Sequence, residues 1–183
     1  MNEAGASLPS KPTIVVADGN ALVAAAVGRT LRAAGFDVFE AVDGPTAFEL
    51  CMSHAPSLVI IDYRMSGSSG AKMARHIATR MLVPVILMSA DTDETVVQEA
   101  IAAGVTGFLA KPVEARQLLP MVHIAMQRAH ELHALRSRVE QLDETLQSRR
   151  HASLATSLLM ARLLIRREEA LQRLRRQAHS IES

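Results

Sequence analysis

The stretch Leu58-Val59-Ile60-Ile61-Asp62-Tyr63-Arg64-Met65-Ser66-Gly67-Ser68-Ser69-Gly70 decides the fold of this chain. Its four consecutive apolar residues are typical of a strand that is buried on both faces of a sheet. The carboxylate of Asp62 follows directly and precedes a loop rich in serine and glycine. The stretch therefore predicts a buried strand with an acidic group at its carboxyl end.

Similar apolar runs occur on both sides of this strand and alternate with helical patterns. Strands are predicted at 13–17, 37–41, 58–61, 83–88 and 106–109, with helices between them at 21–34, 45–54, 71–80 and 94–103. Gly35 and Gly104 follow two of these helices, at the position where glycine commonly ends a helix. The alternation predicts βαβ units, and so a doubly wound α/β domain with a five-stranded parallel sheet.

Polar side chains stand at the carboxyl ends of the predicted strands, where the functional crevice of such sheets lies. They are Asp18, Asp62, Ser89 and Lys111. A single polar residue at a strand end is commonly only a loop residue. Two acids, a hydroxyl and a lysine that precedes a proline together indicate one shared site.

The residues around these positions resemble the receiver domain of two-component response regulators. The matching segments are Val16-Ala17-Asp18, Ala21-Leu22-Val23, Ile61-Asp62-Tyr63-Arg64-Met65 with Gly70, Leu87-Met88-Ser89-Ala90, Ala103-Gly104-Val105 and Gly107-Phe108-Leu109-Ala110-Lys111-Pro112. The resemblance covers residues 12–127. It implies a flavodoxin-like receiver fold, and a regulator rather than an enzyme.

The resemblance also implies a role for several side chains. Asp62 would be the phosphoacceptor, which receives a phosphoryl group from a sensor histidine kinase. Ser89 and Lys111 would contact that group as hydroxyl and cation. Movement of Ser89 toward Asp62 would open space for the ring of Phe108 to turn inward, so these two residues would form the switch.

Mg²⁺ is the implied cofactor, because phosphoryl transfer needs a divalent cation and Mg²⁺ prefers oxygen ligands. Asp18, Asp62 and the backbone carbonyl of Arg64 would hold it. Receivers usually carry a second acid where this chain has Gly19, and a proline where it has Ser66. We therefore expect weakened metal binding and a more flexible loop. A receiver regulated by a partner protein instead of phosphorylation is the alternative.

Composition bounds the remaining possibilities. The chain has 183 residues and one cysteine, Cys51, which we predict to be a buried small hydrophobe. Residues 1–11 are polar, lack the apolar core of a signal peptide, and are expected to be flexible. No apolar run approaches the roughly 20 residues of a membrane span, so we expect a cytoplasmic protein.

The two parts of the chain differ in charge. Residues 1–127 hold 9 Lys and Arg against 12 Asp and Glu, whereas residues 128–183 hold 11 against 7, and every cation in the second part is arginine. This asymmetry permits a nucleic-acid partner, although a solvated helix surface explains it nearly as well.

A seam of apolar residues at heptad spacing follows the receiver-like part. It consists of Leu132, Leu135, Val139, Leu142 and Leu146. Alternating steps of three and four are typical of a coiled coil. We predict a linker helix at 128–147 that forms a homodimer. Packing back onto the same chain is the alternative.

Residues 148–183 resemble the ANTAR output domain, a small helical module that binds RNA hairpins and prevents transcription termination. The matches are Ala155, Leu158-Leu159-Met160 with Arg162, and the pattern from Glu169-Ala170 to Leu174-Arg175. The segment departs from the family at Thr156-Ser157, where Lys-Gly is favoured, and we expect it to lack its last helix. The candidate RNA-binding residues are Arg149, Arg150, Arg162, Arg166, Arg173, Arg175 and Arg176.

The leading hypothesis is a response regulator that controls an RNA-binding antitermination output. The alternative is a protein-interaction module whose tail only dimerises. A phosphatase resembling the haloacid dehalogenase family is disfavoured, because its Asp-x-Asp signature needs an acid where Arg64 stands. A flavin-binding domain is disfavoured because the strand ends offer carboxylates rather than backbone donors. We expect no DNA or membrane partner.

Overall fold

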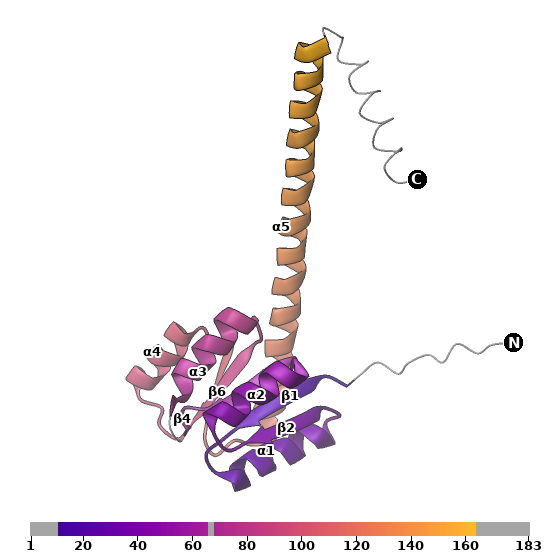
Figure 1. Cartoon of the computed structure of the whole chain (residues 1–183). Helices are drawn as coiled ribbons and strands as arrows, with labels where there is room; N and C mark the ends of the chain where they lie inside the picture. The colour runs from indigo at the N-terminus through magenta and orange to yellow at the C-terminus, as the bar shows by residue number, and fades with distance from the viewer. Residues whose placement is uncertain (1–10, 66–67, 164–183) are drawn as a thin grey trace, which may run out of the picture. The chain divides into compact units, whose positions relative to one another are not determined.

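The computed structural model describes residues 11–65 and 68–163 of the chain. The chain divides into two compact units, Met1–Glu131 and Leu132–Ser183. The first unit contains a sheet with helices on both of its faces (Figure 1). The described part of the second unit consists of helix only.

Five parallel strands form the sheet of the first unit, in the order β2-β1-β3-β6-β7. Their bounds are β1 Thr13–Ala17, β2 Asp37–Ala41, β3 Leu58–Asp62, β6 Val85–Ser89 and β7 Gly107–Ala110. Every residue of β3 is buried, because this strand is central and both faces of the sheet carry helices. The predicted doubly wound α/β fold is confirmed.

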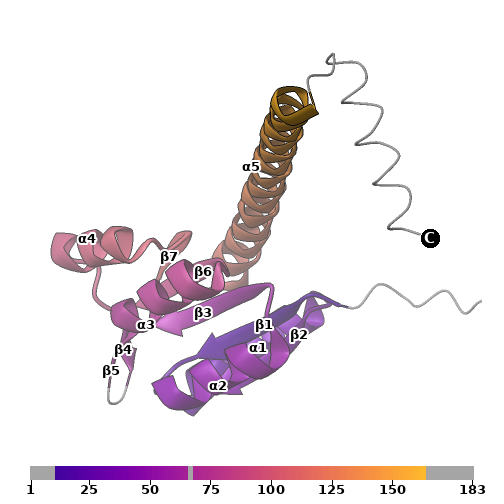
Figure 2. The same ribbon diagram turned by 45° about the horizontal axis from the view of Figure 1, so that its top comes forward.

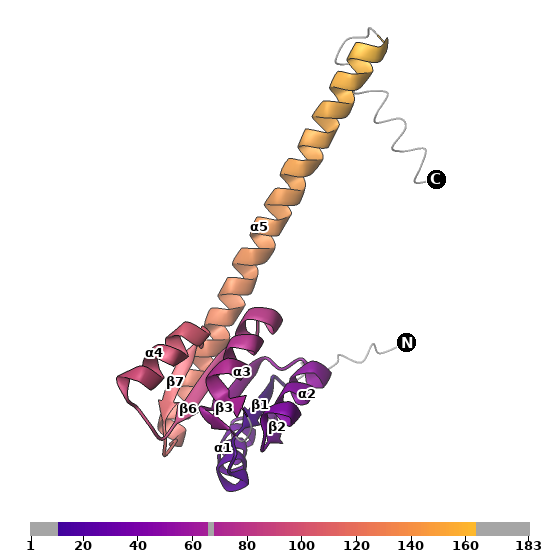
Figure 3. The same ribbon diagram turned by 60° about the vertical axis from the view of Figure 1, so that its left-hand side comes forward.

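The helices are α1 Ala21–Ala33, α2 Gly44–His54, α3 Gly70–His76, α4 Glu94–Ala103 and α5 Ala115–Leu163. Because side chains alternate along a strand, the sheet supports two hydrophobic cores. One core joins α1 and the beginning of α5 through residues such as Leu31 and Val122. The other joins α2, α3 and α4 through residues such as Ala74 and Ala100. Figure 3 shows α3 and α4 side by side.

Short polar contacts set the ends of several helices. The side chain of Asn20 caps α1 by accepting from the backbone N–H of Leu22. Asp43 caps α2 in the same way through the N–H of Thr46, at 2.8 Å, and this hydrogen bond lowers the pKa of Asp43. Gly104 ends α4 in the left-handed conformation, with a φ of 74°. These ends agree with the predicted ones because capping is a local property.

The segment after β3 differs from the prediction in two ways. Helix α3 ends at His76 and continues as a π-helix, η1 Ile77–Met81, where a single α-helix was predicted at 71–80. Apolar spacing over so few residues does not separate the two windings. A hairpin of β4 Arg64–Met65 and β5 Ser68–Ser69 precedes α3 (Figure 2). It was not predicted, because two-residue strands carry no periodicity.

The last two strands are shifted slightly from their predicted positions. Strand β6 begins at Val85 rather than residue 83, since Pro84 has no N–H to donate to a neighbouring strand. Strand β7 begins and ends one residue later than predicted. Both shifts are small, and the shift of β6 makes Ser89 its last residue.

Cys51 is only 1% exposed, which confirms its prediction as a buried residue. Burial raises the pKa of its thiol to about 11.

Among the helices in residues 11–65 and 68–163, none combines the length and apolar character needed to cross a membrane.

Helix α5 supplies all of the described part of the second unit. Each residue of the predicted heptad seam is more than half exposed, from Leu146 at 52% to Leu142 at 64%. The predicted dimerisation surface is therefore open along the helix. Residues 164–183, with the later part of the ANTAR-like pattern, lie outside the described residues.

Candidate functional site

The four polar residues predicted at strand ends lie together at the carboxyl edge of the sheet. Asp62 and Ser89 are the last residues of the adjacent strands β3 and β6, while Asp18 follows β1 and Lys111 follows β7. The exposed fractions of Asp18, Asp62 and Ser89 are 1%, 7% and 1%. Charged and polar groups this deeply buried require partners.

The ammonium group of Lys111 joins the two acids. Its Nζ donates to Asp18 Oδ2 at 2.5 Å and lies 3.0 Å from Asp62 Oδ1. Burial by itself lowers the pKa of Lys111, but the hydrogen bonds and charges of both carboxylates outweigh burial, and the pKa is raised overall. Lys111 is therefore a fixed positive charge beside Asp62.

Backbone groups hold the other side chains of the site. The N–H of Asn20 donates to Asp18 Oδ1 at 2.9 Å, so both oxygens of Asp18 are engaged. The N–H of Asp91 donates to Ser89 Oγ at 3.0 Å. The N–H of Lys111 donates to the carbonyl of Ser89 at 2.8 Å, which ties the ends of β6 and β7 together.

Two side-chain contacts tie the segment after Asp62 to the region around α4. Arg64 Nη2 lies 3.0 Å from Asp91 Oδ2, and the hydroxyl of Tyr63 donates to Glu99 Oε2 at 2.9 Å. The second hydrogen bond raises the pKa of Tyr63. Sequence reasoning missed these partners, because no local pattern specifies which acid meets which residue.

Gly70 gives the backbone its path past Asp62. A Cβ placed on Gly70 would lie 1.9 Å from the carbonyl oxygen of Asp62, closer than non-bonded atoms can approach. The N–H of Gly70 donates to the carbonyl of Tyr63 at 3.0 Å. Only glycine allows this close approach between the start of α3 and the end of β3.

Comparison with known proteins agrees with this geometry. Residues 14–123 match the family model described as the response regulator receiver domain. The chain belongs to the response regulator receiver family. It is 32% identical over 161 residues to the transcriptional regulatory protein PdtaR of Mycobacterium tuberculosis, a match that covers 87% of this chain and 78% of PdtaR.

Further matches cover a smaller share of this chain. The probable transcriptional regulatory protein NarL of M. tuberculosis is 38% identical over 106 residues, which cover 56% of this chain and 49% of NarL. The solved receiver of the putative response regulator NarL from M. tuberculosis is 32% identical, with a TM-score of 0.60, over 65% of this chain and 98% of that one. A CheY-like receiver from Methanospirillum hungatei, at 16% identity and a TM-score of 0.63, shares the fold over 67% of this chain and 98% of that one.

The receiver site offers an oxygen-only set of possible metal ligands. Asp18 and Asp62 supply two buried carboxylates, and the backbone carbonyl of Arg64 belongs to the adjoining segment. Mg²⁺ takes such ligands and keeps several waters, so the chemistry of the donors fits this ion. Within the described ranges, however, no three acidic, histidine or cysteine side chains group as metal ligands.

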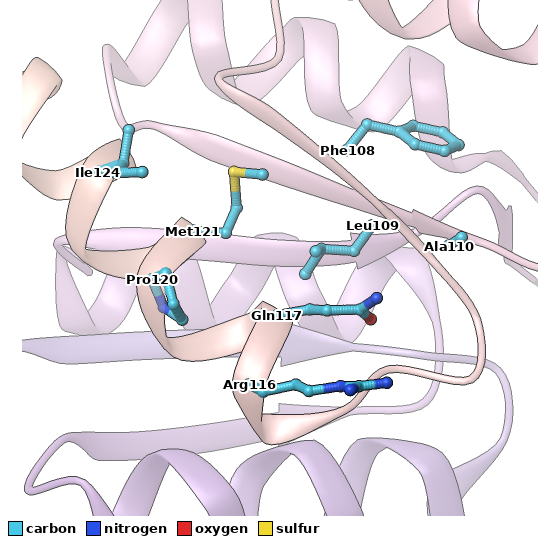
Figure 4. Close-up of a pocket in the computed structure, with 8 residues that line it drawn as sticks. All are labelled: Phe108, Leu109, Ala110, Arg116, Gln117, Pro120, Met121 and Ile124. Atoms are coloured by element: carbon cyan, nitrogen blue, oxygen red, sulfur yellow. The ribbon is translucent and has the colours of Figure 1, made fainter.

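Phe108 lies on β7, outside the cluster of polar residues. It is half-buried and packs against the hydrophobic core that the sheet forms with α2, α3 and α4. It also borders a pocket of about 350 Å³, whose other wall is formed by α5 residues including Gln117, Met121 and Ile124 (Figure 4). Its neighbour on β6 is Leu87, two residues before Ser89.

The structure leaves most of the candidate RNA-binding arginines untested. Arg149, Arg150 and Arg162 belong to α5, and Arg150 is exposed. The other candidates lie outside the described residues; they are Arg166, Arg173, Arg175 and Arg176. Ser66 also lies outside the described residues.

Proposed function

We propose that this chain is a response regulator phosphorylated on Asp62 by a sensor histidine kinase. The observation that carries the proposal is the contact of Lys111 Nζ with Asp62 Oδ1 at the carboxyl edge of the sheet. A carboxylate oxygen of Asp62 forms the new bond to phosphorus. The phosphorus–nitrogen bond of the phosphohistidine breaks, and its electron pair stays on the imidazole nitrogen.

Ser89 and Lys111 stabilise the phosphoryl group in this proposal. The lysine already contacts Asp62, and the hydroxyl of Ser89 stands at the end of the neighbouring strand. When Ser89 donates to the phosphoryl group, the β6–α4 connection moves with it. Phe108 then turns inward and changes the surface that borders α5.

Mg²⁺ is the cofactor that we propose for this reaction, held by Asp18, Asp62 and the backbone carbonyl of Arg64. The ion supplies positive charge that screens the phosphoryl oxygens. With two carboxylates and Gly19 beside Asp18, the site binds it more weakly than a site with three acids.

The proposed output is RNA binding in transcription antitermination by an ANTAR-like tail. Residues 12–127 form the receiver, residues 128–147 a dimeric coiled coil and residues 148–183 the output segment. The alignment with PdtaR spans 161 residues, whereas the first unit of this chain ends at Glu131. Part of the tail therefore has a counterpart in that transcriptional regulatory protein. The excess of arginine in the tail supports a polyanionic partner.

A second candidate function is a receiver controlled by a partner protein, with a tail that only dimerises. The observation in its favour is that Lys111 contacts both carboxylates of the site, Asp18 and Asp62. A site with a third acid would bind the metal ion more strongly. Phosphorylation is not required in that case.

Phosphorylation of Asp62 is tested by incubating the chain with acetyl phosphate and Mg²⁺ and measuring intact mass. We expect the mass of one phosphoryl group to be added to the wild type and not to Asp62→Asn, which keeps the shape of the side chain. An unchanged mass, or equal labelling of the variant, contradicts the proposal.

A further inference from the structure

We propose that α5 pairs with a second copy of itself in parallel and in register, and that charged residues beside the apolar seam decide this direction. The inference rests on the dimeric coiled coil of the proposed function and specifies how its two helices run. The charged residues are Glu131, Arg136, Arg138 and Asp143. In a parallel pair, the two copies of residues 148–183 follow the coiled coil at the same end.

The exposed seam fixes the heptad position of each residue around it. Leu132, Val139 and Leu146 are seven residues apart and take position a, whereas Leu135 and Leu142 take position d. All five are more than half exposed in the single chain. Both d positions are leucine and the central a position is valine, a combination that favours two strands.

The charged residues flank this seam at positions e and g. Arg136 and Asp143 directly follow the d leucines and take position e, while Glu131 and Arg138 directly precede a positions and take position g. All four are exposed. Glu131 accepts a hydrogen bond from Gln127 on the same helix, at 3.0 Å. In the described part of the chain, the ion pairs within one copy involve none of the four, so their charges are available to a second copy.

A parallel, in-register pair brings opposite charges together on both flanks of the seam. In this geometry a residue at g lies beside the e residue that is five positions later in the other copy. Glu131 then meets Arg136 of the other copy, and Arg138 meets Asp143 of the other copy. Because the pair is two-fold symmetric, each contact forms twice.

An antiparallel pair loses part of this charge match. There, e positions lie opposite e positions and g positions opposite g positions. Arg136 can still meet Asp143, because both are at e, but Arg138 is at g and cannot. The contact between Arg138 and Asp143 is therefore specific to the parallel direction.

The apolar seam also overlaps less completely when one helix is reversed. In an antiparallel pair, a positions face d positions. The seam has three residues at a and two at d, so at least one a residue of each copy has no seam residue opposite it. In a parallel pair a faces a and d faces d, and all five residues are matched.

The charges select the direction more than they strengthen association. Exposed ion pairs contribute little to affinity one at a time, because water and salt screen them. The apolar seam drives association, and the difference between attractive and repulsive flanks distinguishes one arrangement from the other.

Disulfide cross-linking tests the direction in the full chain carrying Cys51→Ala. Leu135→Cys places one cysteine near one end of the seam, at a d position. A parallel pair brings its two copies together, within reach of a disulfide, so we expect a covalent dimer under oxidised glutathione. An antiparallel pair instead gives a covalent dimer only when Leu135→Cys is mixed with Leu146→Cys. Ser137→Cys, on the outer face of the helix at position f, is the control and stays uncross-linked.

Charge reversal tests the flanks by sedimentation equilibrium at low salt. In the parallel pair, Arg138→Glu brings like charges together beside Asp143, and we expect the dimer dissociation constant to rise about tenfold. Adding Asp143→Arg restores the opposite charges and the affinity. In an antiparallel pair the added change gives no rescue, because it places two cations together at Arg136. Glu144→Arg, at position f, is the matched control and dimerises like the wild type.

The outcomes separate the direction of the dimer from its existence. A covalent dimer that appears only in the mixture of Leu135→Cys and Leu146→Cys overturns the parallel direction while the coiled coil stands. Failure of Asp143→Arg to rescue Arg138→Glu overturns the role of the charges. A wild type that sediments as a monomer overturns both this inference and the proposed dimer.

Discussion

Tyr63 is the residue after the proposed phosphoacceptor. Its hydroxyl donates a hydrogen bond to Glu99 on α4. The hydrogen bond raises the pKa of the phenol above its ordinary value of 10.0. It stabilises the folded chain fully below that ordinary pKa, and the contribution is lost as pH rises through the folded pKa. Because the chain has one tyrosine and no tryptophan, the absorbance of tyrosinate reports this residue alone.

Titration of Tyr63 is therefore a direct test of the contact. We expect a midpoint above 10.0 in the folded wild type and a lower midpoint in Glu99→Ala, which lacks the acceptor. Glu94→Ala, also on α4, is the control and keeps the raised midpoint. An equal midpoint in the wild type and Glu99→Ala argues against the hydrogen bond in solution.

Gly70 is the residue at which a single methyl group disturbs the site. In Gly70→Ala the new Cβ meets the backbone oxygen of Asp62, which cannot move without displacing β3. We expect a loss of about 1–3 kcal/mol in the free energy of unfolding, measured with urea. In Gly28→Ala the Cβ meets the end of the Glu40 side chain, which can rotate away, so this control loses less. Equal losses would contradict the backbone clash.

At the residue scale, sequence alone located the site but not its internal contacts. Asp18, Asp62, Ser89 and Lys111 were predicted because each stands at the end of a recognisable strand, and parallel strands end at one edge. The pairing of Arg64 with Asp91 depends on how two loops lie in space. Residues distant in sequence meet there without a pattern that marks them.

The exposed seam of α5 is a feature of a single element. Its five apolar residues are more than half exposed along the helix, and a helix gains stability when such a stripe is covered. Since coiled coils bury residues at this spacing, a second copy of the same helix is the proposed partner.

Sedimentation velocity tests this surface. We expect a dimer for the wild type and a monomer for the double variant Leu135→Gln, Leu142→Gln, because two positions that the dimer would bury become polar. Glu144→Gln, on the same helix but off the seam, remains a dimer. A wild-type monomer, or a double variant that still dimerises, contradicts the coiled coil.

Elements were predicted to within a residue or two wherever local signals are strong. Helix α4 has the predicted bounds, because an acidic first turn begins it and Gly104 ends it. The turn of π-helix in η1 and the hairpin β4–β5 were missed. Both are short, so neither leaves a periodic pattern in the sequence.

For the whole molecule, the proposed link is between phosphorylation in the receiver and RNA binding by the tail. The test is titration of a labelled RNA hairpin with the full chain, with and without acetyl phosphate, over a range of salt concentrations. We expect affinity to fall as salt rises, because bound arginines release counterions from phosphates. The phosphodonor is expected to change the affinity of the wild type and not of Asp62→Asn.

A variant of the exposed Arg150 refines the measurement. Arg150→Gln is expected to lower the salt slope by about one if this residue contacts one phosphate. Binding that is absent at low salt, or that shows no dependence on salt, contradicts the antitermination output. Binding that ignores the phosphodonor would leave an RNA-binding tail without control by Asp62.

The sequence by itself determined the fold and the identity of the receiver site, because strand and helix patterns and the residues at strand ends are local signals. It also marked Leu58–Ile61 as the most apolar of the predicted strands, and the structure puts this strand at the centre of the sheet. The tertiary structure decided which groups touch: Lys111 bridges two acids, Gly70 passes the carbonyl of Asp62, and Asp91 holds both Ser89 and Arg64. Those contacts join residues from separate loops, and only the packing of the sheet and helices brings the loops together.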